Sequence, residues 1–332
     1  MSVESVNLLV TASLNEASLQ QITNISSKIK LTNVSELVHA ERKGNASTKE
    51  QLDALLSEAE IIYGLRLPDN VIARAPNLKW LQTTSAGVDR FLDDEFRRSS
   101  VIITNVSGIH ATPIGEFVLG LMLMFAKQAP SCFHMKQERQ WKPFMPTVLH
   151  SKTVGIVGLG SIGREVARLA KAFGMRVVAT RRSARQSKRA RYVDLLFAPD
   201  QLLQLLSESD FVVLTLPLTP ESYRIIGEVE LRSMKPTAYL INVARGNLID
   251  EAALVHALDE HLIAGAGLDV FATEPLPADS RLWELSNVIF SPHVAGGMEQ
   301  YMEQANAVFC ENLSRYLSGK RLVNVVDKKK GY

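Results

Sequence analysis

The segment Gly158–Gly163, with the sequence GLGSIG, constrains the fold of this 332-residue chain more than any other stretch. It follows an apolar run at 154–157 and precedes an amphipathic helical pattern at 164–173. Between a strand and a helix, such glycines allow a tight turn, close approach of the backbone to a pyrophosphate, and close packing of helix on strand. The free N–H groups at the helix N-terminus then attract phosphates. We therefore expect a dinucleotide-binding loop here rather than an ordinary turn.

Short apolar runs alternate with helical patterns along the whole chain. In the first hundred residues the runs lie at 6–10, 36–38, 61–63, 80–83 and 101–104, with helices from about residue 13 and near 49–58. After residue 153, six strands are predicted at 154–157, 176–180, 211–215, 238–242, 265–269 and 288–291. Strands separated by helices need crossover connections, so we expect an α/β protein with doubly wound parallel sheets, the second of them nucleotide-binding.

Three segments stand apart from this alternation. The stretch 113–127 predicts a strong, buried helix with Pro113 in its first turn. Residues 129–150 contain three prolines together with Phe133, Trp141 and Phe144, and predict an irregular arm that carries aromatic anchors. A last helical pattern covers about 297–317 and is followed by a polar tail.

Composition excludes several classes of protein. Hydrophobic residues make up 46% and charged residues 22%, which is typical of a globular chain with a large core. The net charge of +2 provides no general attraction for nucleic acid or anionic lipid. Two cysteines are too few for a disulfide framework or a four-cysteine zinc site, so we expect no metal site and a reducing, cytoplasmic location. The start lacks a signal-peptide pattern, and the apolar stretch 117–126 is about half of a membrane span.

The end of the second nucleotide-domain strand bears on the choice of cofactor. A site for NAD usually places Asp or Glu roughly 20 residues after the glycines, where it binds the ribose hydroxyls. Here the strand ends in Arg181, Arg182 and Ser183, and arginine can pair with a 2′-phosphate. We therefore favour NADP(H), with NAD(H) as the alternative. The six Lys and Arg residues of 181–191 could also simply begin a solvated loop, whereas a nucleic-acid patch is not favoured, because no aromatic residues are interleaved.

Arg245, Glu274 and His293 lie at or just beyond strand ends in the second half of the chain. In open α/β sheets, ligands bind outside the carboxyl ends of the strands, so these side chains can converge on a bound nicotinamide. Each residue alone could equally be a surface group. Together they fit hydride-transfer chemistry, because a histidine can exchange a proton, a carboxylate can orient it, and an arginine can hold a substrate carboxylate.

Four motifs, in the same order, resemble the D-isomer-specific 2-hydroxyacid dehydrogenase family. They are the glycine loop, 242–246 (NVARG), 267–271 (GLDVF) with Glu274-Pro275, and 291–293 (SPH). The run 83–89 (TTSAGVD) also resembles the substrate loop of that family, so the match spans nearly the whole chain. The resemblance implies a flavodoxin-like substrate domain, 1–106 plus 297–332, into which a Rossmann cofactor domain, 107–296, is inserted. It further implies a homodimer built through the cofactor domains, where the aromatic arm would pack.

The resemblance also implies roles for individual residues. His293 would be the acid/base that protonates the substrate carbonyl, Glu274 would fix its tautomer and favour its protonated form, and Arg245 would bind the substrate carboxylate. Ser85, Ala86 and Gly87 would hold that carboxylate from the other domain. Asp269 would accept from the nicotinamide carboxamide, with a helix cap as the competing view, and Leu216 and Pro217 would wall the adenine pocket. The expected cofactor residues are Gly158, Gly160, Ser161, Ile162, Gly163, Arg181, Arg182, Ser183, Leu216, Pro217, Ala244 and Asp269.

Within the family, formate dehydrogenases would require an amide at position 274, and 3-phosphoglycerate dehydrogenases carry an additional regulatory region. Arg181, Arg182 and Ser183 are most similar to the NADPH-preferring glyoxylate/hydroxypyruvate reductases. The expected activity is therefore reduction of a small 2-oxo acid to the D-2-hydroxy acid. The alternative is a dinucleotide-sensing interaction protein on the same fold, like the C-terminal-binding corepressors. A catalytically silent relative is disfavoured, because competent residues fill all three chemical positions.

Overall fold

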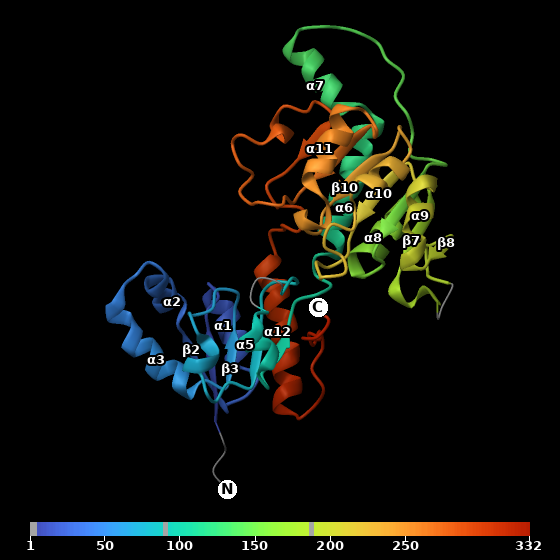
Figure 1. Ribbon diagram of the computed structural model, residues 1–332. Helices are drawn as coiled ribbons and strands as arrows, with labels where there is room; N and C mark the ends of the chain where they lie inside the picture. Colours follow the sequence, from blue (N-terminus) through green and yellow to red (C-terminus); the bar gives the residue numbers. More distant parts are fainter. Residues whose placement is uncertain (1–4, 89–91, 186–188) are drawn as a thin grey trace. The chain divides into compact units, whose positions relative to one another are not determined.

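The chain divides into two compact units, each of which is described by itself (Figure 1). The computed structural model describes residues 5–88, 92–185 and 189–332. Unit 1 consists of Met1–Ile109 and Met298–Tyr332, and unit 2 consists of His110–Gly297. Unit 2 is therefore inserted into the sequence of unit 1.

Unit 1 is built on a parallel sheet whose strands run in the order β2-β1-β3-β4-β5. This order reverses direction between β1 and β3, as it does in flavodoxin-like folds. The strands are β1 (Val6–Val10), β2 (Ile29–Asn33), β3 (Ile61–Tyr63), β4 (Trp80–Gln82) and β5 (Ile102–Thr104). The helices are α1 (Glu16–Thr23), α2 (Ser35–Arg42), α3 (Lys49–Glu58), α4 (Val71–Arg74), α5 (Asp94–Arg98) and α12 (Tyr301–Leu317), with a short 3-10 turn, η1 (Ala46–Thr48).

Core packing ties the C-terminal helix α12 to the first strands of unit 1. The Phe309 ring of α12 is fully buried and stacks on Tyr63 at the end of β3, with 4.0 Å between ring centroids. It also contacts Trp80 of β4, at 5.4 Å. Alternate residues of β1 face opposite sides of the sheet, so Leu8 shares this cluster with α12, whereas Leu9 packs against α3 on the other side. Apolar burial therefore places the last helix in unit 1.

Unit 2 contains a seven-stranded parallel sheet in the order β12-β11-β10-β9-β6-β7-β8. The strands are β6 (Thr153–Val157), β7 (Arg176–Thr180), β8 (Leu195–Phe197), β9 (Phe211–Leu214), β10 (Tyr239–Asn242), β11 (Gly265–Leu268) and β12 (Val288–Phe290). The order reverses between β6 and β9, which is the Rossmann arrangement, and ligands of such sheets bind at this switch point. The two parallel α/β units confirm the fold class predicted from the sequence.

The unit 2 helices cover both faces of this sheet, because the strands are apolar on both sides. They are α6 (Ala111–Ala126), α8 (Ser161–Ala172), α9 (Leu202–Glu208), α10 (Glu228–Ser233) and α11 (Glu251–Asp259), whereas α7 (Ala129–Gln137) has no buried residue. Short 3-10 turns lie at η2 (Arg182–Arg185), η3 (Pro199–Gln201), η4 (Gly246–Leu248) and η5 (Arg281–Trp283). Val213 of β9 packs into one cluster and Val212 into the other, so the sheet is buried on both faces.

Strands β2 and β8 were not predicted, and a strand was predicted at 36–38 where the structure has a helix. The expected strand at 36–38 is wrong, because these residues belong to α2, which begins where the Asn33 side chain accepts from the N–H of Ser35 at 3.0 Å. The actual strand, β2, is mostly half-exposed and polar, so it has no apolar run to reveal it. Strand β8 is only three residues long and lies between a basic stretch and Pro199. Its apolar run was therefore too short to be recognised as a strand.

The predicted irregular arm at 129–150 is also partly wrong. Residues Ala129–Gln137 form helix α7, in which Pro130 occupies the first turn, where its missing N–H costs nothing. Only 138–150 are irregular, and Figure 1 shows this segment looping out beyond α7. We keep the term aromatic arm for residues 138–150. The predicted helices at 164–173 and 297–317 begin instead at Ser161 and Tyr301.

No helix within the described ranges 5–88, 92–185 and 189–332 is long and apolar enough to cross a bilayer. Within the same ranges, no three side chains of His, Cys, Asp or Glu come together as a metal site would require.

Candidate active site

The glycine loop lies between β6 and α8, and two of its glycines are required by their surroundings. Gly158 has φ +103°, and a Cβ atom there would lie 2.9–3.0 Å from atoms of Leu216. A Cβ atom on Gly163 would come within 2.4 Å of the Gly158 carbonyl oxygen. The Thr215 hydroxyl donates to that same carbonyl at 2.5 Å. The loop is therefore folded tightly against the residues that follow β9.

Gly160 differs from Gly158 and Gly163 because the space beside it is open. A Cβ atom on Gly160 would meet no heavy atom within 4 Å. This residue is the N-cap of α8, and because it has no side chain, no capping hydrogen bond occupies the end of the helix. The first helical residues, Ser161 and Ile162, thus present backbone N–H groups beside an open cradle. A pyrophosphate fits such a cradle, because helix N-termini attract anions and the absence of Cβ allows close approach.

The residues predicted to favour NADP(H) over NAD(H) follow β7. Arg181 is half-buried and its backbone N–H donates to Phe197 at 3.2 Å, whereas Arg182 is exposed. Hydrogen bonding to Thr219 lowers the pKa of Glu221, and the charge of Arg182 adds to this shift. Arg182 therefore lies near the loop after β9, which contains Leu216 and Pro217. The side chain of Ser183 lies outside the described part of the structure.

Arg245 and Ala244 form a turn after β10 that a buried asparagine organises. The Asn242 side chain is fully buried; it donates to the Arg245 carbonyl at 2.8 Å and accepts from the Ala244 N–H at 3.1 Å. A Cβ atom on the next residue, Gly246, would lie 1.9 Å from the Phe271 carbonyl carbon. The missing side chain thus brings the Arg245 turn directly against the segment that leads to Glu274.

Glu274 and His293 form a hydrogen-bonded pair in unit 2. Glu274 Oε2 lies 2.9 Å from His293 Nδ1, and Oε1 accepts from the Phe271 N–H at 3.3 Å. The Glu274 side chain is 25% exposed and that of His293 is 43% exposed. A carboxylate on Nδ1 fixes the ring and leaves Nε2 available for proton transfer. These contacts occur at the carboxyl ends of neighbouring strands β11 and β12.

Asp269 anchors the loop that carries His293. Its buried carboxylate accepts from the Ser291 hydroxyl at 2.6 Å and from the N–H groups of Val294 and Ala295 at 2.8 and 3.0 Å. His293 itself has φ +56°, and its N–H donates to the Asp269 carbonyl at 2.9 Å. Asp269 therefore stabilises a strained backbone position. The competing view of Asp269 as a helix cap is wrong, because residues 291–297 form no helix.

His110, which no sequence motif indicated, lies near Arg245. Burial lowers the pKa of His110, and the positive charge of Arg245 lowers it further. A Cβ atom on Gly296 would lie 2.8 Å from the His110 ring, so this ring also packs against the end of the His293 loop. His110, Arg245 and the His293 loop thus occupy one region of unit 2.

In unit 1 the predicted substrate loop follows β4. Ser85, Ala86 and Gly87 are half-buried, whereas Asp89 lies outside the described residues. In the part of the chain that the structure describes, the N–H groups of Ala86 and Gly87 donate no hydrogen bond. Two free, neighbouring N–H groups are suited to a carboxylate.

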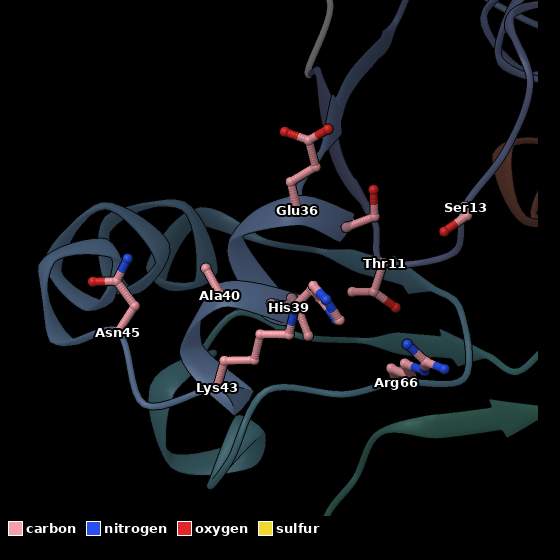
Figure 2. A pocket seen from close by; sticks show the side chains of 10 residues that line it. Thr11, Ser13, Glu36, His39, Ala40, Lys43, Asn45 and Arg66 are labelled. Atoms are coloured by element: carbon pink, nitrogen blue, oxygen red, sulfur yellow. The ribbon is translucent and has the colours of Figure 1, made fainter.

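A second candidate site is a groove in unit 1 of about 620 Å³, which no sequence motif predicted (Figure 2). It lies between α2 and the loops after β1 and β3, and its polar lining includes His39, Lys43 and Arg66. It also contains an acid, Glu36, but Figure 2 shows this carboxylate pointing away from Lys43 and Arg66. Among the described residues no hydrogen bond joins Glu36 to His39, so the groove lacks an oriented acid/base pair.

Comparisons with known proteins identify the family. A family model described as "D-isomer specific 2-hydroxyacid dehydrogenase, NAD binding domain" matches residues 119–295. The chain is 37% identical to glyoxylate/hydroxypyruvate reductase B of Pectobacterium carotovorum subsp. carotovorum, over 82% of this chain and 87% of that protein. The chain belongs to the D-isomer specific 2-hydroxyacid dehydrogenase family. It is therefore an NAD(P)-dependent oxidoreductase acting on 2-oxo and 2-hydroxy acids, which confirms the predicted enzyme class and disfavours the corepressor-like alternative.

Two solved structures of this family have the same fold. One is a D-isomer specific 2-hydroxyacid dehydrogenase from Xanthobacter autotrophicus, in complex with NADPH and MES, at 29% identity and a TM-score of 0.84 over 99% of this chain and 100% of that one. The other is an NADPH-dependent glyoxylate/hydroxypyruvate reductase from Sinorhizobium meliloti, in complex with NADP and sulfate. It has 26% identity and a TM-score of 0.83, over 99% of this chain and 100% of that one.

Replacing Gly160 by Ala tests the cradle without straining the fold. Because a Cβ atom there meets nothing within 4 Å, we expect an unchanged Tm. The same methyl group would occupy the space for the pyrophosphate, so the Kd for NADPH should rise about tenfold or more, as measured by fluorescence titration. Gly120→Ala in α6, also with nothing within 4 Å, is the matched control. An unchanged Kd for Gly160→Ala would show that the phosphates bind elsewhere.

Proposed function

We propose that this dehydrogenase reduces glyoxylate or hydroxypyruvate with NADPH. The observation that carries this proposal is the hydrogen-bonded pair of Glu274 and His293 in the unit that also holds the dinucleotide loop. The choice of substrate is supported by the similarity to the glyoxylate/hydroxypyruvate reductases of Pectobacterium carotovorum and Sinorhizobium meliloti. In this proposal, unit 1 binds the substrate and unit 2 binds the cofactor.

His293 acts as the general acid. Glu274 holds Nδ1 and so orients the ring, which allows Nε2 to give a proton to the carbonyl oxygen of the 2-oxo acid. A nicotinamide held in unit 2 would supply the hydride for the carbonyl carbon. Because Asp269 pins the loop, the ring keeps its orientation throughout this transfer.

Two sets of groups bind the substrate carboxylate. The guanidinium of Arg245 offers a planar fork of donors, and its positive charge also polarises the 2-oxo group. The free N–H groups of Ala86 and Gly87 in unit 1 provide the second set, beside Ser85. Asp269, besides anchoring its loop, would accept from the carboxamide of a bound nicotinamide, for which Oδ2 retains capacity beyond the Ala295 N–H. Ala244, Leu216 and Pro217 line the dinucleotide.

The assay that tests this function follows NADPH oxidation at 340 nm with glyoxylate, hydroxypyruvate, pyruvate and phenylpyruvate. We expect turnover with the first two, and His293→Gln should lower kcat by about 10²–10⁴-fold with little change in the Kd for NADPH, because a general acid is lost. His39→Gln, which alters a histidine that lines the groove of Figure 2, should keep full activity. Turnover that survives His293→Gln but not His39→Gln would move the active site to unit 1.

The preference for NADPH rests on Arg181 and Arg182. Replacing both by Gln removes the charges that would pair with a 2′-phosphate, so kcat/KM with NADPH should fall at least about tenfold, whereas kcat/KM with NADH should change little. Arg232→Gln, an exposed arginine in α10 paired with Glu228, is the control. An equal fall of kcat/KM with NADPH and with NADH would indicate that these arginines do not bind the 2′-phosphate.

The enzyme assembles as a homodimer through the cofactor units, with the aromatic arm packed at the interface. The arm carries large apolar side chains that are exposed to solvent: Trp141 is 95% and Met145 is 87% exposed. Its far end is tied back to α6 by the Thr147 N–H, which donates to Ala126 at 2.9 Å. Exposed apolar groups of this size are typical of a surface that another chain covers. A cytoplasmic location and the absence of a nucleic-acid partner stay predictions from composition.

Sedimentation equilibrium tests the arm. Wild-type protein should sediment as two 36.7 kDa chains. Changing Trp141 and Met145 together to Ser should shift the population toward monomer, because the buried apolar area is lost. Val229→Ser, which is equally a large-to-small change at an exposed position of unit 2, should leave the dimer intact. A double variant that remains dimeric at micromolar concentration would contradict this role.

A further inference from the structure

We propose that Thr83, Asn105 and Tyr301 are positioning residues, which aim the N–H groups of Ala86 and Gly87 at the substrate carboxylate. The inference rests on the proposed function, since it takes the loop after β4 as the carboxylate site. All three side chains belong to unit 1; Thr83 begins the run 83–89, whereas no sequence motif selected Asn105 or Tyr301.

Three successive carbonyl groups of the loop each accept a hydrogen bond from a side chain. The Tyr301 hydroxyl donates to the Thr84 carbonyl at 2.5 Å. The Thr83 hydroxyl donates to the Ser85 carbonyl at 2.7 Å, and the Asn105 amide donates to the Ala86 carbonyl at 2.8 Å. The three donors come from the end of β4, the end of β5 and the start of α12. Residues distant in sequence thus hold one short loop.

Holding these carbonyls determines where the amide hydrogens point. In a planar trans peptide, the C=O of one residue and the N–H of the next point in opposite directions. The bond to the Ser85 carbonyl therefore aims the N–H of Ala86, and the bond to the Ala86 carbonyl aims that of Gly87. The bond from Tyr301 to the Thr84 carbonyl aims the N–H of Ser85 instead, so Tyr301 acts on the other two amides through the Thr83 hydroxyl, which accepts from that N–H. The N–H of Ser85 turns back to the Thr83 hydroxyl at 3.3 Å, which leaves Ala86 and Gly87 as the two neighbouring free donors among the described residues.

The positioning side chains are themselves fixed. Thr83 is 1% and Asn105 is 6% exposed, and the Asn105 side-chain oxygen accepts from the Ser107 N–H at 2.9 Å, so its amide cannot turn over without losing both bonds. Tyr301 begins α12, a helix that is anchored by the buried Phe309. Burial also raises the pKa of Tyr301, so its hydroxyl remains a protonated donor at neutral pH.

Such an arrangement favours anion binding, because the loop need not reorganise when the carboxylate arrives. Preorganised backbone N–H groups bind negative charge without the cost of turning peptide planes against it. Without its side-chain donor a carbonyl is held less firmly, since among the described residues only the Val106 N–H, at 3.4 Å, still reaches the Ser85 carbonyl. Its peptide plane can then rotate, and the amide direction is lost. The effect should therefore fall on binding of the acid and not on binding of the dinucleotide.

The experiment compares two donor deletions with two matched controls. Tyr301→Phe and Thr83→Val each remove one donor with little change of shape. Tyr316→Phe removes the other part-buried tyrosine bond of α12, from its hydroxyl to Glu60 Oε1 at 2.7 Å, and does not alter the loop. Thr83→Ser keeps the hydroxyl. For each variant, the KM for glyoxylate, kcat, the Kd for NADPH and Tm are measured, together with the Kd for oxalate, an unreactive carboxylate of similar size, with NADPH bound.

Each donor deletion should raise the KM for glyoxylate and the Kd for oxalate about five- to tenfold, which corresponds to the loss of one hydrogen bond. The Kd for NADPH should stay the same, and Thr83→Ser should restore both values. If both deletions shift the oxalate Kd no more than Tyr316→Phe or Thr83→Ser does, these side chains are structural and the inference is overturned. Oxalate separates the two proposals, because absence of turnover with any 2-oxo acid would refute the proposed function while the oxalate titration still tests the loop.

Discussion

The buried carboxylate of Asp269 is the group on which the geometry of unit 2 depends. It gathers the Ser291 hydroxyl and two backbone N–H groups, and so holds the turn in which His293 takes a positive φ of 56°. Such a backbone position is unfavourable for a non-glycine residue and persists only where the surroundings compensate for it. Without that anchor, the imidazole would lose its 2.9 Å contact with Glu274. In the proposed mechanism, proton transfer by His293 therefore depends on a carboxylate that need not itself exchange a proton.

Both units place their chemistry at the carboxyl edge of a parallel sheet and hold it there with buried polar groups. In unit 2, Asn242 shapes the Arg245 turn through its two hydrogen bonds. In unit 1, Asn105 acts similarly on the loop after β4. A buried amide can satisfy a donor and an acceptor of an irregular backbone at once, which is why it suits turns that must not move. Both loops are thereby held in place by buried side chains.

Signals that are local in sequence predicted most of the fold and part of the site. Apolar runs such as 154–157 and 211–215 are buried on both faces and revealed their strands directly, whereas β2 is polar and half-exposed and gave no such run. Gly158 was recognisable from its spacing, because the turn requires a positive φ. The roles of Arg245, Glu274 and His293 came from resemblance to a family. His110 and Tyr301 were missed because their contacts join residues more than 130 positions apart, and no periodicity records such contacts.

The groove in unit 1 shows why residue types alone do not define a catalytic site. It contains His39, Glu36 and two cations at the switch point of a parallel sheet, which is also where ligands usually bind. His39 and Glu36 are three residues apart on the same helix, but the carboxylate points away from the cations (Figure 2). In contrast, Glu274 and His293 lie nineteen residues apart in the sequence and meet at hydrogen-bond distance, because neighbouring strands end side by side. Chemistry requires an oriented pair, and here the sheet supplies that orientation where the helix does not.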